Sequence, residues 1–106
     1  MRTRLVVPAD PHSIDAVKSY LAHAFPHCRV EAFWTVDPIE YTFVAYDVRH
    51  RPVCSVIVER GLFDDHGPDS IAGALDDLGL ADSLRYHSSP QVRVTRSGEL
   101  SLQRAV

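Results

Sequence analysis

Long hydrophobic runs are missing from this sequence, and so is a dense set of cysteines. No apolar run approaches the roughly 20 residues of a membrane-spanning helix. The apolar stretch at residues 5–7 is also far shorter than a signal-peptide core, which takes roughly 7 to 15 residues. Two cysteines, Cys28 and Cys54, are too few for the disulfide framework of a small secreted domain. We therefore expect a soluble, cytoplasmic protein without a membrane partner.

Catalytic and metal-binding signatures are missing as well. The sequence has no phosphate-binding loop, and the segment 87–89 (His-Ser-Ser) lacks the glycine elbow of a nucleophile motif. His23 and His27 have the i, i+4 spacing of metal ligands, but Pro26 between them breaks the helix that would align them. We expect no catalytic residue, no cofactor and no metal site, so the sequence favours a non-enzymatic protein over an enzyme.

The composition indicates one globular domain. The 106 residues are 45% hydrophobic and 24% charged, which is typical of a single folded domain, here residues 1–106. Asp10 suits the N-cap of a helix and Pro11 its first position. Ile14, Val17 and Leu21 follow at helical spacing. These signals predict a helix over residues 11–24.

Three β-patterned runs follow this helix. Val30, Ala32 and Trp34 alternate with polar residues, which predicts a half-buried strand. The next two runs are apolar on both faces, as expected of central strands. Strands are therefore predicted at residues 28–36, 41–48 and 53–59, and the turns between them at residues 37–40 and 49–52.

The remaining chain predicts a second helix and a hairpin. Asp69 or Ser70 caps a helix whose apolar stripe includes Ile71 and Leu75, and Gly79 ends it unless the following residues continue as another helical turn. The alternation in residues 91–95 predicts a strand, and the turn 97–98 leads to another at 100–102. Residues 5–7 add an edge strand at the N-terminus.

The expected fold class follows from this order of elements. It is α+β: an antiparallel sheet of three to five strands with two helices on one face, in the order (β)-α-β-β-β-α-β-β.

The charge distribution argues against a nucleic-acid partner. A helix, three strands and a second helix also make up double-stranded RNA-binding domains, which contact phosphates through cationic side chains. The net charge here is -3. The second helix carries Asp76, Asp77 and Asp82, with no cation before Arg85. The basic surface that a nucleic-acid binder needs is therefore not expected.

Two charged segments are candidate binding sites. Arg49, His50 and Arg51 lie at a predicted hairpin tip, where paired guanidinium donors could hold a phosphate or a carboxylate. The alternative is a solvated turn whose charges discourage pairing with other sheets.

The second candidate is the acidic loop at residues 64–69. Asp64, Asp65 and His66 in this loop could bind a hard cation or take part in acid-base chemistry, although the spacing of a calcium loop is absent. The alternative is a set of turn-forming residues before the next helix, whose positive end favours negative charge.

The functional hypotheses depend on the sheet face that the predicted helices leave uncovered. The predicted central strands are apolar on both sides, whereas the helices cover only one side. A homodimer, or a protein or peptide partner, would bury the excess. The first hypothesis is therefore a non-enzymatic interaction or adaptor module that acts as a homodimer. The second is a small-ligand-binding or enzymatic domain that uses the sheet face or the acidic loop. An apolar cavity with convergent polar groups, for example Arg49, Asp64, His66 or His87, would favour it.

Overall fold

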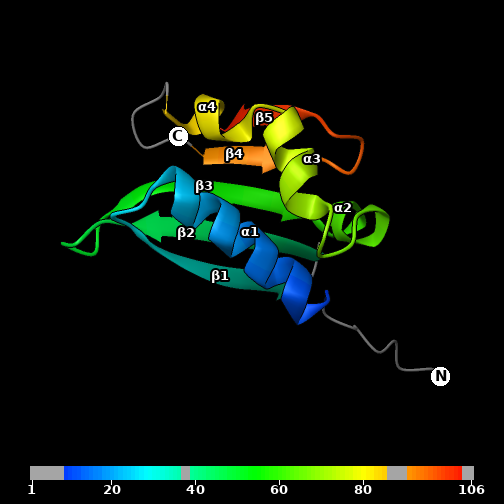
Figure 1. The fold of residues 1–106 in the computed structure, drawn as a ribbon, viewed down its shortest axis with the longest axis horizontal. Coiled ribbons are helices and arrows are strands. Elements are labelled where there is room, and N and C mark those ends of the chain that lie inside the picture. Colours follow the sequence, from blue (N-terminus) through cyan, green and yellow to red (C-terminus); the bar gives the residue numbers. More distant parts are fainter. Residues whose placement is uncertain (1–8, 37–38, 86–90, 104–106) are drawn as a thin grey trace.

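The computed structural model describes residues 9–36, 39–85 and 91–103. Within these residues five strands form one sheet in the order β1-β2-β3-β4-β5. Figure 1 shows the helices gathered on one face of that sheet. The α+β class and the order of elements are confirmed, while the strand expected at residues 5–7 lies outside the described residues.

Helix α1 spans Pro11–Ala24, as predicted. The Asp10 side chain caps it by accepting a hydrogen bond from the backbone N–H of His12 at 2.9 Å. Val17 and Leu21 have no exposed surface and belong to the core. Local signals therefore define this helix at both ends, and its apolar stripe attaches it to the sheet.

Strands β1 (Arg29–Val36), β2 (Ile39–Tyr46) and β3 (Pro52–Glu59) form the expected antiparallel meander. Strands β1 and β3 each begin within one residue of the predicted position, whereas both ends of β2 differ by two residues. Residues 39–40 belong to β2 rather than to the turn before it. Val48, predicted as the end of β2, lies in the following turn and is 83% exposed.

The connection between β3 and β4 corrects the predicted sheet. After β3 the chain forms three short helices, α2 (Arg60–Asp65), α3 (Ile71–Asp77) and α4 (Leu80–Arg85). It then enters β4 (Gln91–Val94), which pairs with β3 in parallel. The prediction of a purely antiparallel sheet was wrong, because a helical crossover returns the chain to the end of the sheet where the previous strand began.

The segment predicted as one second helix is also divided. Gly79 follows α3 with φ 73°, the left-handed conformation expected of a residue after a helix, and α4 continues beyond it. Asp64 and Asp65, predicted in a loop, are the last residues of α2. The final hairpin is confirmed: Gly98 turns the chain with φ 86° into β5 (Leu100–Gln103), which pairs with β4.

One face of the sheet forms the core with all the described helices. Phe43, in the central part of β2, has no exposed surface and lies near Phe63 of α2, with ring centroids 6.4 Å apart. Tyr41 meets the same Phe63 ring edge-on at 5.1 Å, and its hydroxyl accepts a hydrogen bond from the N–H of Ala9. The sheet contributes further buried residues to this face, namely Val30, Ala45, Cys54, Val56, Val58, Val92 and Val94.

Candidate interaction surface

The opposite face of the sheet carries a second set of side chains, since residues alternate between the two faces of a strand. We call it the open sheet face. The strand register places Phe33 opposite Thr42, and Thr42 opposite Ile57. Val44 lies two residues from Thr42 and therefore shares its face. No described helix covers these side chains, so they face outwards.

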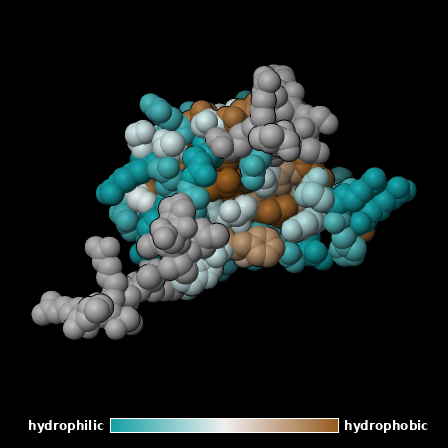
Figure 2. Space-filling model, turned by 180° about the vertical axis from the view of Figure 1, so that it is seen from behind, coloured by the Kyte–Doolittle hydropathy of each residue, from teal (hydrophilic) through white to brown (hydrophobic). Residues whose placement is uncertain are grey.

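Phe33, Val44 and Ile57 form what we call the apolar patch. Val44 is a diagonal neighbour of both Phe33 and Ile57 in the register, so the three residues are neighbours on this face. Figure 2 shows hydrophobic residues in the middle of this face, with hydrophilic residues on both sides. The sequence prediction placed only polar side chains of β1 here. Phe33 was missed, although it interrupts the polar phase of the alternation.

Charged residues surround the apolar patch in pairs. Arg29 and Glu31 are 3.3 Å apart, and the Arg29 guanidinium lies over the Tyr46 ring at 5.6 Å. Arg93 of β4 forms an ion pair with Glu40 of β2, whose side chain is only 15% exposed. A small apolar centre with a polar rim is the usual anatomy of a protein interface.

The β1 border of the sheet is the second feature of this surface. Among the described strands, β1 pairs with β2 and has no neighbour on its other side. Phe33 and Trp34 project to opposite faces of this border and are 48% and 46% exposed. Trp34 is stacked on Tyr41 at 6.3 Å between centroids. Two adjacent half-exposed aromatic side chains therefore mark this edge.

The predicted site at Arg49, His50 and Arg51 is the turn between β2 and β3. The Asp47 carboxylate accepts hydrogen bonds from the N–H groups of Arg49 at 2.8 Å and Arg51 at 3.0 Å, and His50 adopts φ 62°. These backbone hydrogen bonds hold the pKa of Asp47 below its usual range. The three predicted residues are exposed, and the interactions organise a turn.

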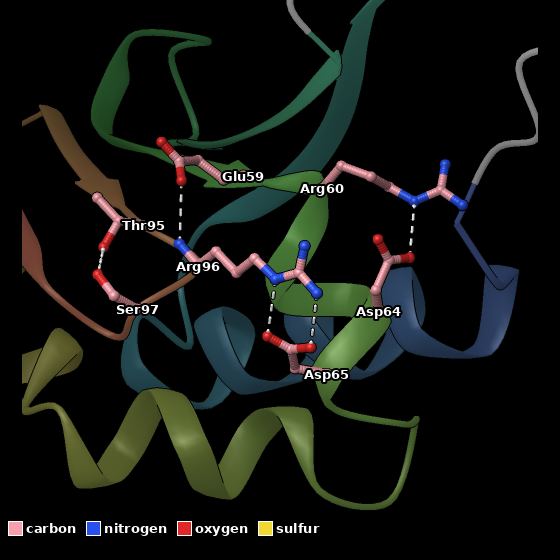
Figure 3. Close-up of polar contacts among 7 residues, drawn as sticks. All are labelled: Glu59, Arg60, Asp64, Asp65, Thr95, Arg96 and Ser97. Atoms are coloured by element: carbon pink, nitrogen blue, oxygen red, sulfur yellow. Dashed lines mark hydrogen bonds and ion pairs between the residues drawn. The ribbon is translucent and has the colours of Figure 1, made fainter.

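The predicted site at Asp64, Asp65 and His66 is the end of α2, and arginine residues hold both of its carboxylates. Asp64 is 3.2 Å from the Nε of Arg60. Asp65 accepts hydrogen bonds at 3.1 Å from both Nε and Nη2 of Arg96, which follows β4 (Figure 3). These bonds fasten the β4–β5 turn to α2.

Gly61 and Glu59 complete this connection. The Arg96 backbone N–H donates to Oε1 of Glu59 at 3.0 Å (Figure 3). The Arg96 side chain passes so close to Gly61 that a β-carbon there would lie 2.2 Å from its Cδ. The second predicted site is therefore a structural clasp of Glu59, Gly61, Asp65 and Arg96, which we call the Arg96 clasp.

The clasp predicts a pH dependence of stability. Hydrogen bonds from Arg96 hold the pKa of Asp65 below its ordinary value. Stability from the ionised carboxylate is present above the pKa of the unfolded chain, about 3.9, and is lost as the pH falls through the lower folded value. We expect Asp65→Asn to destabilise the protein near neutral pH, and the effect to shrink steadily as the pH falls below about 3.9 and through the lower folded value. Urea unfolding of both proteins across this pH range measures the difference in their free energies of unfolding.

Asp69→Asn, at an exposed carboxylate, is the matched control. It should leave the pH profile unchanged. An Asp65→Asn effect of equal size at pH 7 and pH 3 would contradict the role given to the ion pair.

The two predicted sites are not brought together. Residues 49–51 precede β3 and residues 64–66 follow it, so they lie at opposite ends of that strand (Figure 1). His87, another residue considered for such a cavity, lies outside the described residues. The convergence of Arg49, Asp64 and His66 on one pocket is therefore not found.

The cysteines are free thiols within the core layer. Burial raises the pKa of Cys54 to about 11, and burial also raises the pKa of Cys28. Both thiols are therefore protonated and weakly nucleophilic at neutral pH. In the described part of the chain, no three His, Cys, Asp or Glu side chains gather as they would around a metal ion.

A groove of about 520 Å³ between α1, α3 and α4 was not predicted from the sequence. Small residues form much of its lining, and Tyr20 spans it. The Tyr20 hydroxyl accepts a hydrogen bond from the N–H of Ala81 at 3.2 Å and lies 3.5 Å from Oδ1 of Asp76, while burial raises its pKa. Arg85 is 3.5 Å from Asp82 and donates to the carbonyl of Ala24. These polar groups therefore already have partners across the groove.

Comparisons of the chain with models of protein families, with characterised proteins and with solved structures give no significant match. None of the described helices has the length and hydropathy needed to cross a membrane.

Proposed function

We propose that this chain is a non-enzymatic protein-interaction module that acts as a homodimer in the cytoplasm. The observation that carries the proposal is Phe33, which is 48% exposed and belongs both to the apolar patch and to the β1 border. A chain that works alone would gain solubility from a polar residue at this position. Phe33 is therefore assigned to a contact between proteins, and the remaining open sheet face is available to a protein or peptide partner.

The electrostatics support a protein partner rather than a nucleic acid. Among the described strand residues of the open sheet face, the cations are Arg29 and Arg93, which are paired with Glu31 and Glu40. Phosphate binding needs cations that are not already neutralised by neighbouring carboxylates.

The alternative hypothesis, a ligand-binding or enzymatic domain that uses the sheet face or the acidic loop, has less support. Asp64 and Asp65 are engaged by Arg60 and Arg96. The open sheet face offers an apolar centre whose neighbouring charges form the pairs Arg29–Glu31 and Arg93–Glu40. General acid-base chemistry needs a titratable group within reach of a substrate, and ion pairs of this kind do not supply one.

Light scattering coupled to size-exclusion chromatography tests the proposal. The native chain should have twice its monomer mass of 11.8 kDa and should dissociate on dilution. Phe33→Lys should raise the dissociation constant at least tenfold, about 1.4 kcal/mol, because a lysine on an edge strand opposes pairing and places a charge in the contact. The monomer should remain folded, since Phe33 is already half-exposed.

Val48→Lys is the matched control, because it makes the same change at an apolar residue that is 83% exposed in the β2–β3 turn. It should leave the dimer intact. A native chain that is monomeric at every concentration would refute the homodimer. Equal weakening by the two variants would remove Phe33 from the contact.

A further inference from the structure

Charged side chains guard only part of the outer edge of β1 against pairing with another strand. Exposed edge strands present unpaired N–H and C=O groups, and proteins usually discourage pairing there with charges, proline or bulges. Arg29 and Glu31 supply charges to the first part of this eight-residue strand. The remainder of β1, residues 32–36, has no charged residue and includes the half-exposed Phe33 and Trp34.

We propose that β1 pairs with β1 of a second copy of this chain, antiparallel about a two-fold axis at Phe33. The two five-stranded sheets then become one continuous sheet. This inference rests on the proposed homodimer and specifies its contact, which is the edge of the sheet rather than its face.

The sequence of β1 favours this register over those with the axis at Glu31 or Ala32. With the axis at Glu31, the two Glu31 carboxylates would face each other, and like charges directly opposite are destabilising. With the axis at Ala32, Glu31 would lie opposite Phe33 of the other copy. With the axis at Phe33, the two Phe33 residues meet as a cross-strand aromatic pair and Glu31 lies opposite the uncharged Thr35.

The same register matches large and small side chains on the helix-covered face. There Trp34 of one copy lies opposite Ala32 of the other, which provides space for the indole. The match occurs twice because the pairing is symmetric. An edge that complements itself closes into a dimer, whereas pairing of β1 with a different edge would propagate into filaments. This self-complementarity identifies a second copy, rather than an unrelated peptide, as the occupant.

The apolar patch is continuous across the proposed axis. Phe33 lies at the β1 border of the patch, with Val44 and Ile57 extending inwards over β2 and β3. Pairing at Phe33 therefore joins the patches of the two copies into one surface on the open sheet face, larger than either copy offers alone.

Disulfide cross-linking tests the register. Residues directly opposite in an antiparallel pair have Cα atoms about 4.5 to 5.5 Å apart, within the range of a disulfide. Phe33→Cys, in a Cys28→Ser background, should link two chains on mild oxidation. Val44→Cys is the control, because Val44 lies one strand further from the axis in each copy, which separates the pair by roughly 10 Å more. Peptide mapping by mass spectrometry identifies the linked residues.

We expect the Phe33→Cys chain to cross-link at least tenfold faster than the Val44→Cys chain. If the native chain is dimeric but Val44→Cys links as fast or faster, the edge pairing is overturned while the homodimer stands. If the native chain is monomeric, both proposals fail.

Because Phe33→Cys can itself weaken the dimer, hydrogen exchange on the native chain provides a second test of the edge pairing that needs no substitution. Backbone N–H groups in residues 30–36 that point outwards should exchange at least tenfold more slowly at dimeric than at monomeric concentrations. Protection that does not depend on concentration would mean that the edge is covered within one chain, for example by residues 5–7. It would overturn the proposal.

Discussion

Phe43→Ala is expected to lower the free energy of unfolding by about 3 to 5 kcal/mol, the usual cost of removing a buried aromatic ring. Phe43 has no exposed surface, and it lies opposite Ala32 of β1 and Val56 of β3 in the register. Small neighbours on one side leave little that could move into the vacated space, and the cost of such a cavity grows with its volume. Urea unfolding followed by circular dichroism measures the change.

Val44→Ala is the matched control, since Val44 is the next residue of β2 and points to the open sheet face. At a concentration where the chain is monomeric, this substitution should cost less than half as much as Phe43→Ala. A similar cost for both would mean that the open sheet face is buried in the monomer. That result would remove the basis of the proposed interface.

Gly61→Ala is expected to destabilise the protein by about 1 to 3 kcal/mol, the usual cost of an added methyl group in a filled site. The sign is opposite to the usual effect of this change, because replacing glycine by alanine where the backbone permits it reduces the entropy of the unfolded chain and stabilises by about 0.4 to 1 kcal/mol. The new β-carbon would lie 2.2 Å from Cδ and 2.7 Å from Cγ of Arg96. These are middle atoms of the side chain, so Arg96 cannot make room without leaving Asp65.

The reverse sign is expected once Arg96 is removed. In an Arg96→Ala background the Arg96 atoms next to Gly61 are gone, and Gly61→Ala should stabilise the chain by about 0.4 to 1 kcal/mol, because it reduces the entropy of the unfolded chain. Thermal or urea unfolding of the four proteins in this double-mutant cycle gives the coupling energy. If Gly61→Ala stabilises the native background as well, the Arg96 side chain moves aside freely and the clasp is not rigid.

The local signals in the sequence were sufficient for much of the secondary structure. Asp10 and Pro11 start α1 where predicted, and Gly98 makes the final hairpin turn. These predictions succeeded because caps, turns and periodicity act over a few neighbouring residues. The ends of β2 were predicted less well, because Asp47 begins the next turn through its own hydrogen bonds to Arg49 and Arg51.

The candidate sites depended on contacts distant in sequence, and so the sequence predicted them less well. Asp65 and Arg96 are 31 residues apart, and no local pattern indicates that the two groups meet. The acidic loop was therefore interpreted without its partner. Phe33 was missed for a related reason, since its exposure depends on which sheet face the helices leave uncovered.

Local propensity and alternation are enough to specify the α+β class, the order of helices and strands, and the faces on which most side chains of each strand lie. Three features depend instead on the packed chain: β4 runs parallel to β3, Arg96 lies against Gly61, and β1 borders the described strands. Each of these depends on how segments far apart in the chain pack together, and the free energy of that packing is not a property of any single segment.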